Sequence, residues 1–208
     1  MKFSRLFKVI AFGVFSFGVL SAYVRAFTVA APSMSPTFLT GDFIMSNHAA
    51  YDLRWPHLDR VMLQTGEPRQ GDLIMYFDIP KQVIATKRIV GLPGDVVKMA
   101  NNVLYVNGVA AQQTQLLRNI FAGVPAENGL GELVVKETLG SREYLITYTP
   151  GKSPVRDFDE VRVTHGKYFI LGDHRDNSAD SRYIGLIARD QIKGRVFQGA
   201  RTLAAYEK

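Results

Sequence analysis

Beyond residue 26 the chain consists of short apolar runs separated by clusters of glycine, proline, asparagine and aspartate. Apolar runs of about four to eight residues bounded by turn-forming residues are typical of β-strands. The pattern predicts strands at 27–30, 43–45, 73–77, 83–90, 103–106, 144–148 and 167–171, with one more within 196–204 that closes the sheet or lies on its surface. Asn107 and Gly108 predict a tight hairpin after the fifth of these strands. We therefore expect a mostly β fold.

Helical patterns are weak in the same part of the chain. Residues 188–192 fit one helical turn, and residues 112–121 are ambiguous between helix and loop. The segment 110–162 is rich in polar and turn-forming residues, which indicates a β insertion between two halves of a core. The length of 208 residues fits one medium-sized domain, or a smaller domain with an anchor.

The N-terminal end has a different pattern, because residues 9–24 are sixteen consecutive residues without a charge. As a helix they would cover about 24 Å, somewhat less than the roughly 30 Å hydrocarbon core of a bilayer. The difference closes if Lys8 and Arg25, at the two ends, extend their charged groups toward the lipid surface. We interpret residues 9–25 as one transmembrane anchor.

The charges around this segment predict its orientation. Basic residues precede it within 1–8, and an excess of positive residues favours the cytoplasmic side. Residues 1–8 are then expected in the cytoplasm and residues 26–208 outside it. A cleaved signal peptide and a buried core helix share this pattern, although Arg25 fits poorly in a cleavage site built from small residues.

Composition narrows the function classes. The formal net charge is +6, but four basic residues and no acidic ones lie in the first 25, so the rest of the chain carries only +2. A charge this small, without a basic stripe interleaved with aromatics, argues against nucleic-acid binding. The sequence has no cysteine, which excludes disulfides and thiolate metal sites. Its four histidines lack the spacing of a zinc-binding pair, so we expect no metal.

Candidate chemistry begins with Ser33, which lies between two prolines in the segment 32–37 directly after the apolar run. A serine hydroxyl is a poor nucleophile until a base removes its proton. His174, in a dense polar run, allows a Ser-His-Asp arrangement, although a surface-loop histidine is the simpler interpretation. Lys87 is the other candidate, because apolar neighbours on both sides can bury it and lower the pKa of its amine. A lysine in such a run can instead extend from a sheet edge into water.

Four sequence blocks, in this order, carry a resemblance to the bacterial type I signal peptidases (leader peptidases), which are membrane-anchored serine–lysine endopeptidases. They are Ser-Met-Ser-Pro-Thr at 33–37, Gly-Asp-Phe-Ile at 41–44, Lys-Arg-Ile-Val-Gly-Leu-Pro-Gly-Asp at 87–95 and Gly-Asp-His-Arg-Asp-Asn-Ser-Ala-Asp-Ser-Arg at 172–182. The similarity is looser within 110–162. It implies an antiparallel β-sheet catalytic core with a β insertion, preceded by one N-terminal transmembrane helix.

The resemblance also assigns roles to individual residues. Ser33 would be the nucleophile and Lys87 the general base, while Ser178 would hydrogen-bond the lysine amine and orient it. We call residues 172–182 the last loop. The charged scaffold that holds this loop against the strand of Lys87 would consist of Asp173, Arg88, Asp180 and Arg182.

A second group of residues surrounds the nucleophile in the sequence. The candidates for the substrate cleft are Phe27, Val29, Ala31, Met34 and Phe38. The last two could equally be plain core residues. We expect three further aromatic side chains in the core rather than in a membrane-facing patch, namely Tyr51, Trp55 and Phe77.

Two positions depart from the family pattern. Ala31 stands where the family often has a serine whose hydroxyl helps to stabilise the oxyanion, so the hole would depend on the backbone N–H of Ser33 or on another group. His174 stands where the family usually has asparagine, which we interpret as a tolerated loop change.

The implied function is removal of signal peptides from exported preproteins, with cleavage after a small residue and without a metal or other cofactor. The implied location is the cytoplasmic (inner) membrane, with a single pass and an extracytoplasmic catalytic domain at 26–208, so the partners are preproteins and the lipid bilayer. One rival is a self-cleaving serine–lysine protease of the repressor type, which lacks an anchor. Another is a membrane-tethered binding or assembly factor on a catalytically weak peptidase scaffold, for which Ala31 is the main support.

Overall fold

The computed structural model describes residues 7–10, 12–13, 23–55, 60–116, 133–149 and 155–198. Its strands are β1 (Val24–Thr28), β2 (Phe43–Asn47), β3 (Asp52–Arg54), β4 (Val61–Gln64), β5 (Leu73–Asp78), β6 (Val83–Gly91), β7 (Val96–Ala100), β8 (Val103–Val106), β9 (Val109–Ala110), β10 (Gln112–Gln115), β11 (Leu133–Leu139), β12 (Arg142–Tyr148), β13 (Phe158–Arg162), β14 (Lys167–Leu171), β15 (Ile187–Ala188) and β16 (Ile192–Gln198). The helical turns are η1 (Pro32–Met34), α2 (Ser181–Ile184) and η3 (Arg189–Gln191). Pairings between these strands are antiparallel, which confirms the predicted mostly β, antiparallel fold.

The largest sheet has seven strands in the order β1-β2-β16-β5-β6-β14-β15. Within it, β6 pairs with β5 from Val83 to Arg88. Its partner on the other side, β14, begins to pair with β6 only at Arg88. One edge of residues 83–87 is therefore not paired with β14.

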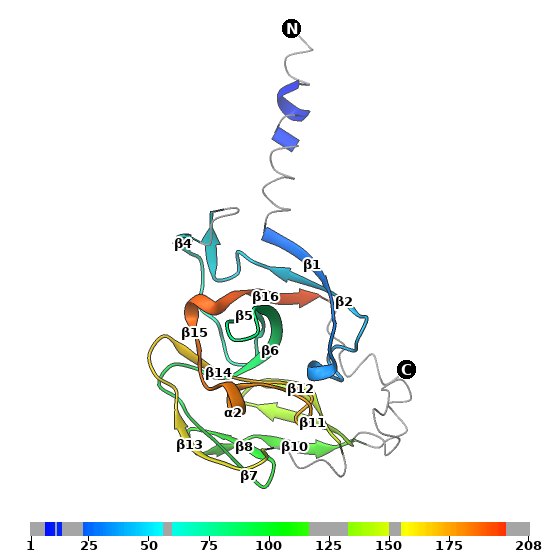
Figure 1. Cartoon of the computed structure of the whole chain (residues 1–208), viewed down its shortest axis with the longest axis vertical. Helices are drawn as coiled ribbons and strands as arrows, with labels where there is room; N and C mark the ends of the chain where they lie inside the picture. Colours follow the sequence, from blue (N-terminus) through cyan, green and yellow to red (C-terminus); the bar gives the residue numbers. More distant parts are fainter. Residues whose placement is uncertain are drawn as a thin grey trace.

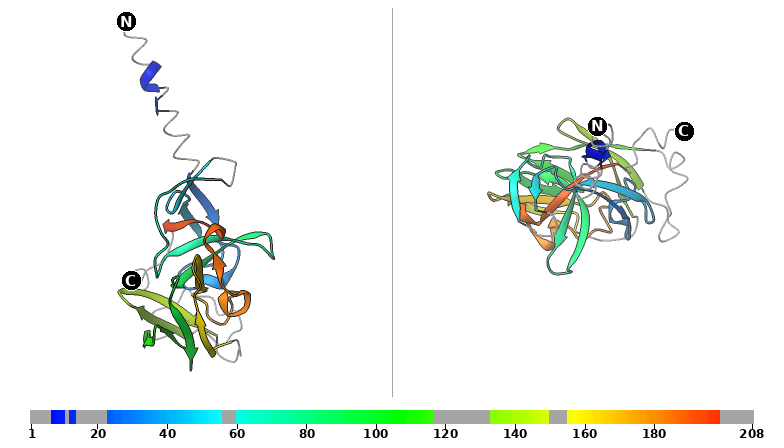
Figure 2. Two further views of the ribbon diagram at one scale, coloured as in Figure 1. Left: turned by 90° about the vertical axis from the view of Figure 1, so that its left-hand side faces the viewer. Right: turned by 90° about the horizontal axis from the view of Figure 1, so that it is seen from above.

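The remaining strands of the described chain form a four-stranded sheet (β13-β7-β8-β9), a three-stranded sheet (β10-β11-β12) and the β3–β4 hairpin. The first two of these sheets lie at the end of the body opposite β1 (Figures 1 and 2). The predicted insertion at 110–162 supplies β10 to β13, but β7 to β9 belong to the same sheets and core. Strands β7 to β13 therefore form a second group of strands, which begins at Val96, before the predicted insertion.

The central strand β5 of the large sheet is buried on both faces, which explains why it reads as a continuous apolar run. Successive side chains of a strand point to opposite faces. On β5, Ile74 and Tyr76 pack into one core cluster, and Met75 packs into another with Phe38 and Ile44.

Several predicted boundaries differ from the structure. The strand expected at 27–30 begins earlier, at Val24, where it pairs with β2. The strand expected within 196–204 begins at Ile192 and lies between β2 and β5 rather than closing the sheet. Residues 112–115 are a strand, and the rest of the ambiguous segment lies outside the described residues.

Other local expectations can be compared directly with the structure. Asn107 and Gly108 have φ angles of 53° and 80°, as the predicted tight hairpin requires, because both central residues of such a turn have positive φ. Tyr51 is buried, whereas Trp55 is 53% exposed, so the core prediction for the tryptophan was wrong. It lies at the end of β3 in a two-stranded hairpin, which has too few neighbours to cover its ring.

Only part of the predicted anchor at 9–25 can be compared with the structure, because residues 11 and 14–22 lie outside the described ranges. Val24 and Arg25 belong to β1, so the strand begins before the predicted end of the anchor. Among the residues that are described, no helix combines the length and the apolar character needed to cross a membrane.

Candidate active site

The nucleophile candidate lies on a short turn beside the large sheet. Ser33 is the middle residue of η1, and Pro32 occupies the first position of that turn, where the fixed φ of proline favours helical geometry. Met34 and Phe38, on either side of the next turn, are fully buried in a core cluster. The backbone carbonyl of Ser33 accepts a hydrogen bond from the N–H of His174 (3.2 Å). The turn is therefore fixed by the core and by the last loop.

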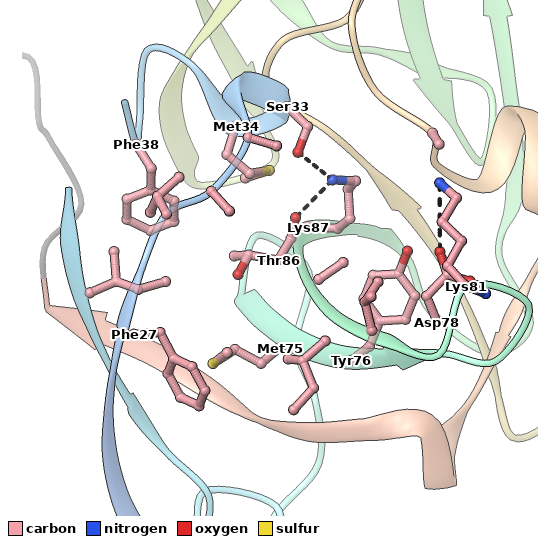
Figure 3. A pocket seen from close by; sticks show the side chains of 18 of the residues that line it. Phe27, Ser33, Met34, Phe38, Met75, Tyr76, Asp78, Lys81, Thr86 and Lys87 are labelled. Atoms are coloured by element: carbon pink, nitrogen blue, oxygen red, sulfur yellow. Dashed lines mark hydrogen bonds and ion pairs between the residues drawn. The ribbon is translucent and has the colours of Figure 1, made fainter. Parts of the chain in front are cut away.

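The base candidate reaches this serine from β6. Lys87 Nζ lies 2.7 Å from Ser33 Oγ and 2.9 Å from the backbone carbonyl oxygen of Thr86 (Figure 3). Lys87 is only 3% exposed. The interpretation in which this lysine extends from a sheet edge into water is therefore wrong.

Burial lowers the pKa of the Lys87 amine from 10.5 to about 8, because an apolar environment penalises the charged form. The carboxylates of Asp180 and Asp173 act against this and raise the pKa, while the nearby amine of Lys81 lowers it further. About half of the amine is then neutral at pH 8, and a neutral amine can accept the proton of a serine hydroxyl.

A buried ion pair joins the strand of the lysine to the last loop. Arg88 Nε and Nη2 donate to the two carboxylate oxygens of Asp173 at 2.8 and 2.7 Å, a bidentate geometry that fixes both side chains. The guanidinium of Arg88 lies over the Tyr144 ring, 4.0 Å from its centroid. The hydroxyl of Thr37, which follows the nucleophile turn, also donates to Asp173. These contacts connect β6, the nucleophile turn and the last loop.

The second pair of the predicted scaffold shapes the last loop itself. Arg182 Nε and Nη2 each donate to Asp180 at 2.8 Å. Asp180 also accepts from the backbone N–H of Gly172 (2.9 Å), and Arg182 donates to the carbonyl of Arg175 (2.6 Å). The Arg88–Asp173 pair therefore links the last loop to β6, and the Arg182–Asp180 pair joins parts of the last loop to one another.

Ser178 differs from its prediction. Its hydroxyl is buried and has no hydrogen-bond partner in the part of the chain that the structure describes, so the expected bond to the Lys87 amine is not formed. The hydroxyl lies beside Gly172 instead, where an added Cβ would be 2.2 Å from Ser178 Oγ and 2.5 Å from the Ser33 carbonyl oxygen. Glycine at this position therefore allows the last loop to approach the nucleophile turn.

His174 is completely buried, so its interpretation as a surface-loop residue was wrong. The residue forms a bridge to Thr147 of β12, which covers the loop from the second group of strands. Its ring Nε2 shares a hydrogen bond with Thr149 Oγ1 (2.8 Å). Ser33 Oγ bonds to Lys87, which favours lysine over histidine as the base.

A cleft of about 470 Å³ opens beside Ser33 and Lys87. All of the predicted cleft residues line it: Phe27, Val29, Ala31, Met34 and Phe38. Residues 83–87 of β6 form another wall. Because this wall combines a strand edge with apolar side chains, the cleft suits an extended peptide with apolar side chains.

The sequence pattern did not indicate three polar residues that line the same cleft, Tyr76, Asp78 and Lys81. The amine of Lys81 lies 3.9 Å from Asp78 Oδ2 (Figure 3). The only signal that could have found them is the register of the β5–β6 hairpin, which places Asp78 opposite Val83 and Tyr76 opposite Ala85.

The geometry of the site defines a class of protein. A serine hydroxyl hydrogen-bonded to a buried lysine with a lowered pKa is the arrangement of a serine hydrolase that uses an amine as its base.

The comparisons with known proteins agree with this class. The family model described as "Signal peptidase, peptidase S26" matches residues 3–198. The signal peptidase I of Pseudomonas aeruginosa is 35% identical over 192 residues, and that of Pseudomonas fluorescens is 34% identical over 190. A solved signal peptidase I from Enterococcus faecalis is 25% identical and covers 62% of this chain and 97% of its own, but its TM-score of 0.36 supports no comparison of folds.

The chain belongs to the signal peptidase S26 family. The alignments with the two Pseudomonas proteins cover 85% of this chain, and the chain spans 64% of the length of each of those relatives.

Proposed function

We propose that this protein is a membrane-anchored serine endopeptidase that removes signal peptides from exported preproteins and cuts after small residues. Ser33 is the nucleophile and Lys87 the general base in this proposal. The single observation that carries it is the distance of 2.7 Å between Ser33 Oγ and Lys87 Nζ, in a lysine that is 3% exposed. Membership of the S26 family and the names of the two Pseudomonas relatives support the substrate class.

The strand edge beside the nucleophile supports the way in which a substrate binds. Residues 83–87 of β6 pair with β5 on one side, and β14 does not pair with them on the other. An extended peptide can add to such an edge through main-chain hydrogen bonds. Its scissile carbonyl then lies beside Ser33, with the neighbouring side chains in the apolar part of the cleft.

The reaction proceeds through an acyl-enzyme. Neutral Lys87 takes the Ser33 proton as Oγ attacks the carbonyl carbon, and the resulting ammonium gives that proton to the leaving amine when the peptide C–N bond breaks. The same amine then takes a proton from water, whose oxygen attacks the ester, and returns it to Oγ as the ester bond breaks. The reaction needs no metal or other cofactor for any of these proton transfers.

The oxyanion hole depends on the main chain in this proposal. Ala31 has no hydroxyl to offer and lines the cleft with a methyl group. The backbone N–H of Ser33 remains as the donor to the oxygen that becomes negatively charged in the tetrahedral intermediate.

The topology follows the charge pattern of the sequence. We place residues 1–8 in the cytoplasm, residues 9–25 in the cytoplasmic membrane and the catalytic domain at 26–208 outside the cytoplasm, with 110–162 as its insertion. An anchor confines the enzyme and the membrane-tethered precursor to one surface, which raises their effective concentration.

Replacement of Lys87 by methionine tests this function. The full-length protein in detergent is mixed with a precursor that carries a signal peptide, and the cleavage products are identified by mass spectrometry. We expect wild-type protein and Lys98→Met, a matched change at a lysine whose side chain is 40% exposed, to cleave after a small residue, and Lys87→Met to be inactive. Normal processing by folded Lys87→Met would refute the serine–lysine mechanism, and no processing by any variant would favour a binding or assembly role.

A further inference from the structure

Tyr76 carries a buried hydroxyl that the mechanism above does not use. The residue is 1% exposed, and Tyr76 Oη has no hydrogen-bond partner among the residues that the structure describes. A buried hydroxyl without a partner is unfavourable, because it has lost its hydrogen bonds to water. The hydroxyl therefore does not stabilise the resting protein, and a hydrogen-bond partner in another state of the protein would account for its presence.

The position of this hydroxyl relates it to the general base. Tyr76 on β5 lies opposite Ala85 on β6, and Ile74 lies opposite Lys87. Residues two apart on a strand share a face, so Tyr76 and Lys87 are diagonal neighbours on one face of the hairpin, within reach of an aromatic and a long side chain. Both residues line the cleft, and the tyrosine hydroxyl points into the space between Lys87 and Lys81 (Figure 3).

The Lys87 amine gains a proton during the reaction, and its additional N–H then needs a hydrogen-bond acceptor. Among the described residues its partners are Ser33 Oγ and the Thr86 carbonyl. A protonated amine has three N–H donors. When Ser33 Oγ has become an ester oxygen, its capacity to accept a strong hydrogen bond falls, so the ammonium needs a better acceptor at that stage.

The charges around Tyr76 suit it to this task. Burial, and after it the carboxylates of Asp78 on β5 and Asp180 on the last loop, raise the pKa of its phenol, which therefore stays protonated. A neutral phenol accepts through its oxygen and can donate its own hydrogen to a carboxylate. The other charged groups that face Lys87 are Asp173 on the last loop and Lys81 in the β5–β6 turn.

We infer that Tyr76 is a positioning residue for the general base: its hydroxyl accepts a hydrogen bond from the Lys87 ammonium while that amine holds the proton taken from the nucleophile or from water. This inference rests on the proposed function. It assigns Tyr76 a role in the charged intermediates of the reaction and none in the resting protein.

Tyr76→Phe tests the inference, because it removes one oxygen and keeps the ring in its core cluster. Tyr51→Phe is the matched control: Tyr51 is equally buried in the same cluster, lies outside the lining of the cleft, and donates to Asp72 at 2.7 Å. Both variants are assayed as full-length protein with a signal-bearing precursor for kcat and KM, and by thermal unfolding for Tm.

We expect Tyr76→Phe to lower kcat by about 10- to 100-fold, the effect of losing one hydrogen bond to a charged group, with KM unchanged and Tm unchanged or higher. Tyr51→Phe should lower Tm and leave kcat unchanged. If Tyr76→Phe has the same kcat as wild type, the inference is overturned. A fall of kcat together with Tm would also overturn it, because that is the result expected of a structural role. Either result leaves the proposed function intact, since that function depends on the loss of activity in Lys87→Met.

Discussion

The buried amine of Lys87 should make the protein less stable than it could be. Replacing this lysine by methionine keeps the length of the side chain and removes the ionisable group. We expect the variant to be inactive and, near neutral pH, more stable than wild type. The reason is that the folded protein holds the protonated amine in surroundings from which most water is excluded.

The magnitude follows from the pKa. Each tenfold change in an acid dissociation constant corresponds to about 1.4 kcal/mol. A pKa of about 8 in place of 10.5 therefore means that folding costs about 3 kcal/mol more when Lys87 is protonated. Methionine removes this cost but also loses hydrogen bonds to Ser33 and Thr86, each worth about 1 kcal/mol. The net gain for Lys87→Met at pH 7 is then about 1 kcal/mol, and it rises to about 2 kcal/mol if Ser33 finds another partner.

The dependence on pH is the sharper part of this prediction. The folded pKa lies below the unfolded one, so the unfolded chain binds more protons between about pH 8 and 10.5. The free energy of unfolding of wild type should therefore rise relative to the variant across this window and stay at a constant offset below it. Denaturant unfolding of full-length protein in detergent, from pH 6 to 10.5, measures the difference. Lys98→Met, at a half-exposed lysine, should show the same pH dependence as wild type. A difference in unfolding free energy between wild type and Lys87→Met that does not change with pH would refute the reasoning.

Three further predictions concern activity. The value of kcat/KM should rise as pH passes through about 8, the pKa of Lys87. The midpoint should move to higher pH in Lys81→Met and to lower pH in Asp78→Asn, because the Lys81 amine lowers the pKa of Lys87 and the Asp78 carboxylate raises it. Unchanged midpoints would show that Lys81 and Asp78 have no influence on the pKa of the base. Ala31→Ser should raise kcat several-fold, since the new hydroxyl can donate to the oxyanion, and an unchanged kcat would mean that a donor already occupies that place. Gly172→Ala should abolish cleavage, since its Cβ would lie 2.5 Å from the backbone carbonyl oxygen of the nucleophile Ser33; cleavage at the wild-type rate would contradict the close packing of the loop.

The residues at the centre of the site could be predicted from the sequence because each lies in a short block with a strong local pattern. Ser33 follows a proline at the start of a turn, and Lys87 lies inside a long apolar strand. Arg88 of β6 pairs with Leu171 at the end of β14, and Asp173 follows Leu171 by two residues, so the pairing of these strands brings Arg88 and Asp173 together.

The parts that sequence reasoning missed depend on contacts between distant segments. Tyr76 reads as one residue of an apolar strand, and only the register against β6 places its hydroxyl near the base. His174 reads as a polar loop residue, yet Thr147 of β12 and Thr149, directly after that strand, cover it. The bond expected between Ser178 and the lysine depends on the conformation of the last loop, in which that hydroxyl lies beside Gly172 and has no hydrogen-bond partner among the described residues.

The second group of strands supports the site as well as extending the core. Glu137 on β11 forms a buried ion pair with Arg175 of the last loop and accepts a hydrogen bond from the Tyr144 hydroxyl (2.8 Å). The Tyr144 ring in turn lies against Arg88, which holds Asp173. A buried ion pair is strongly destabilising when one partner is removed, so these contacts fix the last loop at two points. The segment that the sequence identifies as an insertion therefore supplies the surface against which the residues next to the base are held.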